Sequence, residues 1–307
     1  MRQTSTRRRA AVIGGGTMGT DIAAIFTAGG WQVEVMEPDE SRWGQARARV
    51  KSSHEQLGGS GEPSAIFVST LGRISWGDLG IVVECVPEKL ELKQRVFGEL
   101  EKLAPRDLML ASNSSSFPIS DIARGLVTGN RMLGLHFFMP AHLVPAVEVV
   151  KGEATNQAVC DQCAALMREL GKVPVMVKKD VPGFLANRLQ HALAREAFAM
   201  IDEGLASAED VDAAVRYGFG LRYLAAGPVL QKDIAGLDIH CAAARTMYPS
   251  LANNSAPSKV LADKVDQGKL GMKTGEGFYR WSAESAAAEK ARYERALLEA
   301  LKVLKST

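Results

Sequence analysis

The chain has 307 residues, of which 46% are hydrophobic and 23% charged, and its formal net charge is +2. That length can bury a sizeable core in one large or two medium domains, and the balanced charge gives no basic footprint for nucleic acid. No apolar run reaches about 18 residues, so we expect no membrane span, and the short apolar stretch near the start is unlike a signal peptide. Four cysteines are too few for a disulfide scaffold and favour a reducing, cytoplasmic environment.

The first two thirds of the chain alternate short apolar strands with helices. The run from Ile81 to Val86 is almost continuously apolar, which is typical of a parallel strand buried on both faces. Alternation of this kind predicts a doubly wound α/β sheet. The expected strands are 10–13, 31–37, 81–86, 108–111, 132–138, 146–150 and 173–177, and the expected helices among them are 20–28, 88–103 and 155–170.

The pattern changes at Asp180-Val181-Pro182-Gly183, beyond which only helices are expected, at 184–203, 207–217 and 285–305. We therefore predict an α/β domain over residues 1–179 and an all-α domain over 180–307. Cys160 and Cys163 form a C-x-x-C inside a predicted helix rather than at its start, and no second ligand pair accompanies them. Buried thiols are expected there, with no metal site.

A glycine-rich turn joins the first strand to the first helix and reads Gly14-Gly15-Gly16-Thr17-Met18-Gly19. It fits G-x-G-x-x-G in the strand-to-helix context of a Rossmann-type dinucleotide site. Gly14 allows the tight turn, Gly16 lets the backbone approach the pyrophosphate, and Gly19 lets the helix pack on the strand. The backbone N–H groups at the helix start, at Thr17 and Met18, face the phosphates.

Glu37 ends the second strand, eighteen residues after Gly19. An acid there accepts hydrogen bonds from the adenosine ribose and repels a 2′-phosphate, so NAD is predicted as the cofactor rather than NADP. The alternative is a glycine-rich turn with an unrelated surface glutamate.

A dense polar cluster follows the strands near the middle of the chain. Ser112 to Ser116 come directly after a buried strand, and His136 lies in the next one. Pro140 and Pro145 separate His136 from Glu148, so the chain can double back and bring the carboxylate to the imidazole. Such a pair fixes the tautomer of the histidine and strengthens it as a base. The alternative is an ordinary hydrogen-bonded core histidine.

These motifs together resemble the L-3-hydroxyacyl-CoA dehydrogenases and their relatives that oxidise free 3-hydroxy acids, such as gulonate dehydrogenases. The resemblance covers nearly the whole chain. It rests on Gly14 to Gly19, Val83-Glu84 with the following helix, Ala111 to Ser116, His136 to Pro140 with Val147 to Val150, Asp180 to Arg188 and Gly271 to Tyr279.

The resemblance implies roles for individual residues. His136 would be the general base and Glu148 its partner, while Ser115 and Asn187 would hold the reacting oxygen. Ser115 would also border the cofactor, and Glu88 and Lys93 would lie near its nicotinamide half. The family further implies fatty acid metabolism and a homodimer built through the C-terminal helices.

Three departures from the family bear on the substrate. Met139 stands where the family motif has asparagine, so we list it with the substrate contacts, and the stretch between Glu37 and Ile66 is short for the helical hairpin that helps to cover CoA in acyl-CoA members. Gly218 to Tyr223 resembles the free-acid relatives, and its Arg222 could bind a carboxylate or simply lie at the surface.

The leading expectation for the substrate is a short-chain 3-hydroxyacyl-CoA such as 3-hydroxybutyryl-CoA, because the thioester is the more common substrate of the family. The first alternative is a small free 3-hydroxy acid, gulonate- or carnitine-like. The remote alternative is a non-catalytic dinucleotide-binding or structural protein on the same fold. The polar set of His136, Glu148, Ser115 and Asn187 argues against that last possibility, since a structural protein has no need to keep all four.

Overall fold

The computed structural model describes residues 8–306 and falls into two compact units, Met1–Arg188 and Leu189–Thr307. The first unit continues past the boundary predicted near residue 180. Phe184 is buried in the core of this unit, and the backbone N–H groups of Leu185 and Ala186 donate to Glu148 within it. These contacts hold the start of the following helix to the sheet.

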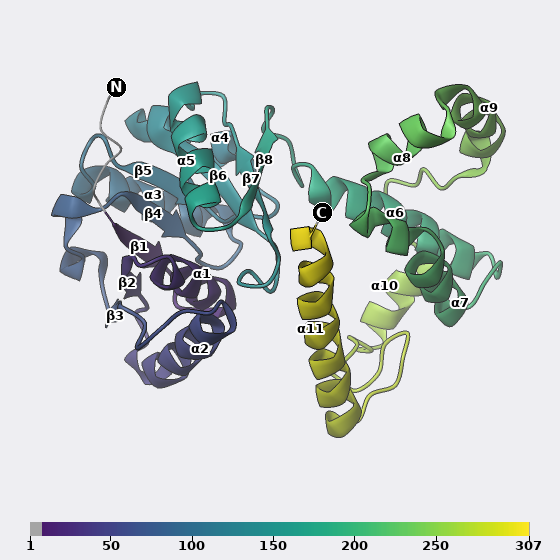
Figure 1. Cartoon of the computed structure of the whole chain (residues 1–307), viewed down its shortest axis with the longest axis horizontal. Coiled ribbons are helices and arrows are strands. Elements are labelled where there is room, and N and C mark those ends of the chain that lie inside the picture. The colour runs from purple at the N-terminus through teal and green to yellow at the C-terminus, as the bar shows by residue number, and fades with distance from the viewer. Residues whose placement is uncertain (1–7, 307) are drawn as a thin grey trace. The chain divides into compact units, whose positions relative to one another are not determined.

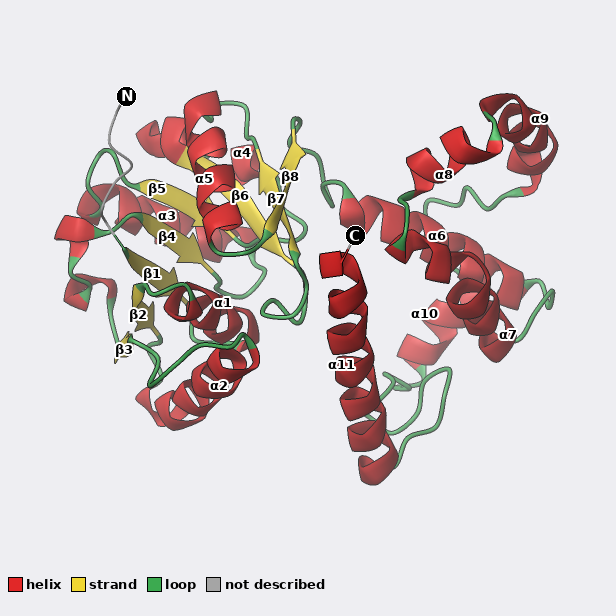
Figure 2. Ribbon diagram, viewed as in Figure 1, coloured by secondary structure: helices red, strands yellow, loops and turns green. Residues whose placement is uncertain are grey.

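The first unit is built on an eight-stranded sheet in the order β3-β2-β1-β4-β5-β6-β7-β8 (Figure 2). Strands β1 to β6 are parallel, β7 is antiparallel to β6, and β8 is parallel to β7. The strand order reverses between β1 and β4, where open sheets of this kind bind ligands. The strands are β1 (Arg9–Ile13), β2 (Gln32–Met36), β3 (Ala65–Val68), β4 (Ile81–Glu84), β5 (Met109–Ser112), β6 (Met132–Phe137), β7 (Ala146–Val150) and β8 (Val173–Val177).

Helices cover both faces of this sheet because successive strand residues point to opposite sides. Ala10 and Val12 of β1 face one core, with α1 (Thr17–Ala28), α2 (Trp43–Gln56) and α5 (Gln157–Glu169) packed over it. Ala11 and Ile13 face the other core, with α3 (Leu90–Leu103) and α4 (Ile119–Ile122) (Figure 1). This arrangement confirms the predicted doubly wound α/β sheet.

The cysteines of the C-x-x-C lie in the first of these cores. Cys160 and Cys163 of α5 are fully buried, and burial raises the pKa of both thiols. Among the described residues, no group of three or more His, Cys, Asp or Glu side chains could hold a metal ion.

The second unit contains helices and no strand among its described residues. Gly204 ends the first long helix with a positive φ of 69°, as expected of a C-cap glycine, and the Ser207 hydroxyl accepts a hydrogen bond from the Asp210 N–H at the start of the next. The helices are α6 (Ala186–Asp202), which begins in the first unit, α7 (Ala208–Ala213), α8 (Pro228–Ala235), α9 (Leu237–Met247), α10 (Lys259–Asp266) and α11 (Ala283–Ser306).

Apolar burial differs sharply between the two units. Every buried hydrophobic residue of the described chain lies at or before Phe184, whereas large apolar side chains such as Val229, Ile234 and Ile239 are more than 60% exposed in the second unit.

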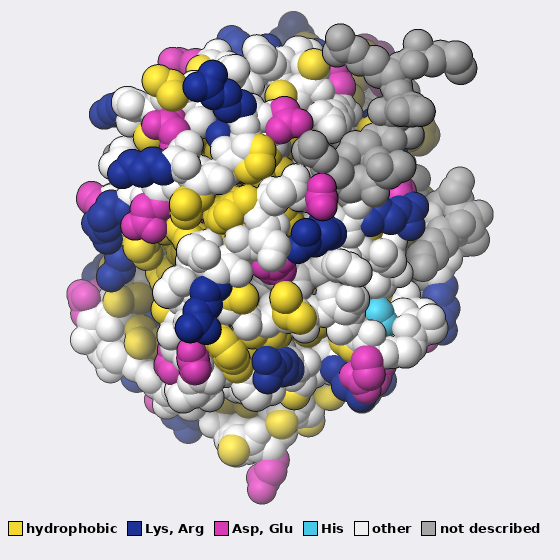
Figure 3. All heavy atoms as spheres, turned by 90° about the vertical axis from the view of Figure 1, so that its left-hand side faces the viewer, with side chains coloured by type: hydrophobic (Ala, Val, Ile, Leu, Met, Phe, Trp, Pro, Cys, Tyr) yellow, Lys and Arg dark blue, Asp and Glu magenta, His cyan; other side chains and the backbone are white. Residues whose placement is uncertain are grey.

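None of the described helices is long and apolar enough to cross a membrane. On the face drawn in Figure 3, basic and acidic side chains are interspersed and form no continuous basic surface.

Candidate active site

The glycine-rich turn has the geometry that a dinucleotide requires. Gly14 has a φ of 112°, and a Cβ there would lie 2.7 Å from the Cys85 carbonyl oxygen. A Cβ on Gly19 would lie 1.8 Å from the Gly14 oxygen, so only glycine permits this packing of α1 on β1. Around Gly16, in contrast, a Cβ would meet open space. The backbone at the N-terminus of α1, where Thr17 is exposed, is therefore open to a phosphate group.

Glu37 is buried directly beneath this turn. Its Oε2 accepts a hydrogen bond from the Gly15 N–H at 3.1 Å, and its Oε1 lies 3.6 Å from Nη1 of Arg42. Met18, in the first turn of α1, packs against the hydrophobic core beneath α1, α2 and α5. The carboxylate therefore ties the turn to the end of β2, and its role in binding the adenosine ribose stays a prediction.

His136 and Glu148 face each other across β6 and β7. The two are direct partners in the antiparallel register, and Nδ1 of His136 lies 2.8 Å from Oε2 of Glu148. Both side chains are buried. The reversal of the chain at the two prolines thus brings the predicted pair together. Because Nδ1 contacts the carboxylate, Nε2 is the nitrogen left for proton transfer.

The second oxygen of Glu148 is held by backbone. Oε1 accepts hydrogen bonds from the N–H groups of Leu185 at 3.0 Å and Ala186 at 2.8 Å, at the start of α6. Burial raises the pKa of Glu148, but the hydrogen bonds from His136 and these two N–H groups outweigh it and lower the pKa overall. The carboxylate stays ionised as a counter-charge for the imidazole.

Two phenylalanines fix the plane of the His136 ring. Phe138 meets it edge-on, with ring centroids 4.7 Å apart, and Phe184 lies 5.7 Å away. Phe184 has a φ of 47°, an unusual value for a residue with a Cβ, and it follows Gly183 at φ 74°. Strained backbone of this kind is concentrated at functional sites, and here it places an aromatic ring against the base.

Ser115 and Asn187 are also brought together, since the Asn187 side-chain amide donates to the Ser115 carbonyl oxygen at 3.4 Å. The loop that carries Ser115 is held by Glu88. One oxygen of Glu88 accepts hydrogen bonds from the Ser114 hydroxyl at 2.6 Å and from the backbone N–H groups of Ser115 and Ser116. Although burial raises the pKa of Glu88, these bonds and the nearby ammonium group of Lys93 lower it overall.

A buried ion pair beneath this loop was missed from the sequence. Lys93 is 1% exposed and its Nζ contacts Glu84 at 2.9 Å and Glu88 at 3.2 Å. Glu84 also accepts from the Ser112 hydroxyl at 2.6 Å. Through Glu88, Lys93 is linked to the loop that carries Ser115, and its expected place near the nicotinamide stays a prediction. A carboxylate inside the apolar run from Ile81 to Val86 was the available signal, because a charge in such a strand needs a buried partner.

Two predicted substrate residues lie at the surface of their own units. Met139 is 65% exposed in the connection that follows β6. Arg222 lies in a 3₁₀ turn of the second unit, Gly220–Leu224, and its side chain is exposed with no ion pair among the described residues. Their roles remain predictions.

Comparison with known proteins identifies the family. The model of the 3-hydroxyacyl-CoA dehydrogenase NAD binding domain matches residues 9–181, and that of the 3-hydroxyacyl-CoA dehydrogenase C-terminal domain matches residues 183–281. The chain belongs to the 3-hydroxyacyl-CoA dehydrogenase family. As a member of this family it is an NAD-dependent oxidoreductase, and the open backbone at Gly16 fits that cofactor.

Relatives within the family differ in their named substrates. The chain is 33% identical over 305 residues to the 5-formyl-3-hydroxy-2-methylpyridine 4-carboxylate 5-dehydrogenase of Mesorhizobium japonicum, covering 97% of this chain and 98% of the relative. It is 34% identical over 235 residues to the L-carnitine dehydrogenase of Oceanobacillus iheyensis, covering 75% and 76%.

Solved structures of the family also resemble this one to different degrees. A crystal structure of a 5-formyl-3-hydroxy-2-methylpyridine 4-carboxylic acid 5-dehydrogenase, described as an NAD⁺-dependent dismutase, has a TM-score of 0.92 at 32% identity and covers 97% of this chain and 98% of its own. The (S)-3-hydroxybutyryl-CoA dehydrogenase of Ralstonia eutropha has a TM-score of 0.73 at 28% identity and covers 90% and 100%.

Proposed function

We propose that this dehydrogenase oxidises a hydroxyl-bearing carbon of a small free carboxylate, with NAD as the hydride acceptor and His136 as the base. The observation that carries the proposal is the TM-score of 0.92, over 97% of the chain, to an enzyme whose named substrate is a pyridine carboxylate. The L-carnitine dehydrogenases, which are also named for a free acid, support the same substrate class.

The described residues support a specific chemical role for each group of the site. When bound, NAD supplies the carbon that accepts a hydride. His136 takes the hydroxyl proton at Nε2, because Nδ1 contacts Glu148, and the ionised carboxylate stabilises the imidazolium that results. Ser115 and Asn187 are proposed to hold the reacting oxygen. General acid–base help of this kind contributes roughly 10²–10⁴-fold to the rate. A hydrated aldehyde presents the same H–C–O–H group, so an aldehyde of the same acid is also a candidate substrate.

The segment between β2 and β3 gives separate support for a free acid. One α-helix, α2, fills it after a short 3₁₀ turn. A helical hairpin that covers CoA, as the family resemblance describes for acyl-CoA members, needs two helices. The chain therefore has less material with which to cover a CoA thioester. The single helix and the full-length structural similarity together lead us to favour a free acid over the thioester, which was the leading expectation because it is the more common substrate of the family.

A short-chain 3-hydroxyacyl-CoA is the second candidate, favoured by the match to the Ralstonia eutropha 3-hydroxybutyryl-CoA dehydrogenase. The test is kcat/KM for NADH formation with 3-hydroxybutyryl-CoA, free 3-hydroxybutyrate, carnitine and 5-formyl-3-hydroxy-2-methylpyridine 4-carboxylate. We expect at least one free acid to exceed the thioester by roughly tenfold or more, a difference of about 1.4 kcal/mol in transition-state stabilisation. A thioester preferred over every free acid would refute the proposal.

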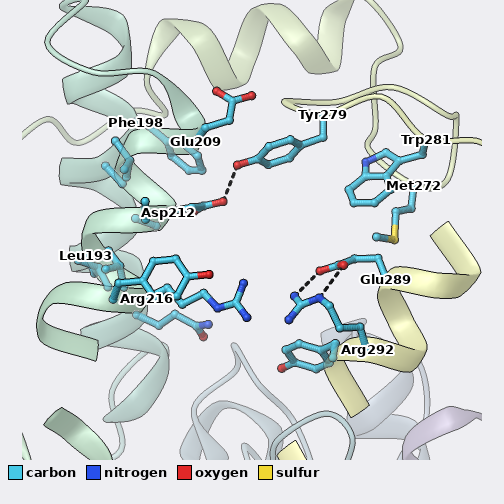
Figure 4. Close-up of a pocket in the computed structure, with 18 of the residues that line it drawn as sticks. Leu193, Phe198, Glu209, Asp212, Arg216, Met272, Tyr279, Trp281, Glu289 and Arg292 are labelled. Carbon is cyan, nitrogen blue, oxygen red and sulfur yellow. Dashed lines mark hydrogen bonds and ion pairs between the residues drawn. The ribbon is translucent and has the colours of Figure 1, made fainter. Parts of the chain in front are cut away.

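We further propose a homodimer assembled through the C-terminal helices. Between residues 189 and 304 no hydrophobic side chain is buried, and a helical unit of this size needs apolar burial for stability. The unit also contains a cavity of about 1040 Å³ between α6, α7 and α11, with Leu193, Phe198, Tyr279 and Trp281 in its walls (Figure 4). A second copy would cover these apolar surfaces.

Two pairs of polar side chains in the wall of this cavity bind each other. The Tyr279 hydroxyl donates to Asp212 at 2.6 Å, and Arg292 binds Glu289 through two nitrogens (Figure 4).

Light scattering after size-exclusion chromatography tests the dimer. A monomeric mass, with the second unit protected from proteolysis, would rule it out.

A further inference from the structure

The connection between the two catalytic strands, residues 138–145, has to preserve an exact pairing. His136 and Glu148 are twelve positions apart and are opposite partners in the register of β6 and β7. A slip of one residue would turn Glu148 to the other face of the sheet. A two-residue turn would set the register by its own geometry, but a connection of this length does not. Contacts made by the connection itself therefore contribute, together with the burial of both strands, to keeping this register.

Lys172, between α5 and β8 and directly before Val173, supplies such a contact. Its Nζ donates to the carbonyl oxygens of Ala141 at 2.7 Å, His142 at 3.3 Å and Val144 at 2.9 Å, all within the connection. The side chain is 7% exposed. Burial lowers the pKa of Lys172 to about 8, so the ammonium form predominates at neutral pH, and only that form has three N–H donors for three carbonyls.

The same connection is joined to the helix that follows the glycine-rich turn. Nδ1 of His142 lies 3.1 Å from Oδ2 of Asp21 in α1, and Nε2 of His142 lies 2.9 Å from the Gln56 side-chain oxygen in α2. Asp21 is fully buried and also binds the guanidinium group of Arg49 through both of its oxygens. Lys172 thus holds the connection from the side of β8, and His142 places the connection against α1 and α2, with its hydrogen bond made to Gln56.

We propose that Lys172 is a positioning residue, whose ammonium group gathers the carbonyls of the β6–β7 connection and thereby keeps Glu148 opposite His136. The inference rests on the proposed function only in taking the His136–Glu148 pair as the acid–base group. Lys172 touches neither of these side chains in the described contacts. Its effect on turnover should therefore pass entirely through the pair.

A double-mutant comparison tests this dependence. Lys172→Met keeps most of the apolar stem and removes the charge and all three donors. Lys178→Met, at the other end of β8 where the side chain is exposed, is the matched control. We expect Lys172→Met to lower kcat by about thirtyfold or more while the Kd for NAD changes by less than about threefold. In a Glu148→Gln background the same change should lower kcat by less than about threefold, because the pair is already broken.

Equal losses in the two backgrounds, or an unchanged kcat, would overturn the proposal. Lys172→Gln, which keeps two N–H donors, serves for the same comparison if circular dichroism shows that Lys172→Met is unfolded. A measurement that needs no substrate tests the role of Lys172 independently of the proposed function. The downfield imidazole N–H resonance of His136, assigned with His136→Gln, should persist in Lys178→Met and disappear in the Lys172 variants even if no tested acid is a substrate. Persistence in the Lys172 variants would also overturn the proposal.

Discussion

Replacing Glu148 by glutamine should disable the base while leaving its shape in place. The carboxylate accepts from His136 through Oε2 and from Leu185 and Ala186 through Oε1. An amide has one oxygen, so it can accept hydrogen bonds either from His136 or from the two backbone N–H groups, but not from both. If that oxygen stays with the backbone, the amide N–H₂ faces Nδ1 of His136 and forces the proton onto Nε2. The nitrogen that must accept the substrate proton is then already protonated.

The opposite orientation of the amide fares no better. Its oxygen would meet His136, but its N–H₂ would point at the two backbone N–H groups of Leu185 and Ala186, leaving buried donors unpaired. We therefore expect kcat to fall by about 10²–10⁴-fold, the range of general acid–base help and of a reversed tautomer in comparable sites. One lost charge-assisted hydrogen bond should lower the free energy of unfolding by about 1.5–3 kcal/mol.

The assay is steady-state NADH formation over a range of pH, with Glu153→Gln, an exposed acid shortly after β7, as the control. In Glu148→Gln the acid limb of the kcat/KM profile should move to lower pH, because the imidazolium loses its counter-charge. The Kd for NAD should stay near the wild-type value. A variant that keeps more than about a tenth of kcat, or a profile that does not move, would show that the two residues are not coupled.

The same substitution has a signature in stability. The fold lowers the pKa of Glu148, since the hydrogen bonds it accepts outweigh the effect of burial. Its stabilisation is therefore fully present above the unfolded value, about 4.3, and is lost as the pH falls through the lower folded value. The difference in unfolding free energy between wild type and Glu148→Gln should be largest above about pH 5 and shrink below about pH 4. Urea titrations at several pH values measure it.

Three further substitutions test the rest of the site. His136→Ala should lower kcat by about 10²–10⁴-fold with nearly unchanged NAD binding by calorimetry, and retention of more than about a tenth of kcat would remove the base assignment. Glu37→Ser should raise kcat/KM with NADP, because it removes the repelling charge and frees Arg42 for a 2′-phosphate, and an unaltered NAD-to-NADP ratio would contradict the role of Glu37. If Arg222 binds the substrate carboxylate, Arg222→Met should lower kcat/KM for free acids by an amount equivalent to about 2–5 kcal/mol of transition-state stabilisation and should change it little for a thioester. Arg245→Met, at an exposed position, is the control.

The central pair could be predicted from the sequence because its signal is local. The apolar strand around His136, the two prolines and the alternating strand around Glu148 together specify a reversal, and β7 has the bounds predicted for it. Beyond the sheet the prediction was less complete. The helix expected over 207–217 is α-helical only to Ala213 and continues as a π-helical segment, Ala214–Phe219.

The buried cations could not be predicted in the same way. A lysine is expected at the solvated surface, and only its three-dimensional partner justifies its burial. For Lys93 that partner is Glu84, which lies at the end of a different element. For Lys172 it is a set of three backbone carbonyls, which every sequence has and which therefore leave no trace in residue types. The periodicity of hydrophobic residues along the sequence gives no information about tertiary hydrogen bonds of this kind.

The uneven burial of apolar side chains has a consequence for how the protein behaves on dilution. If the second unit dimerises as proposed, its stability depends on protein concentration by mass action, because the second copy covers its exposed hydrophobic side chains. The first unit has its own core and the turn for NAD, and it should keep both at any concentration. Cofactor affinity should then stay constant as the sample is diluted, whereas turnover should fall if the substrate is bound by a residue of the second unit such as Arg222.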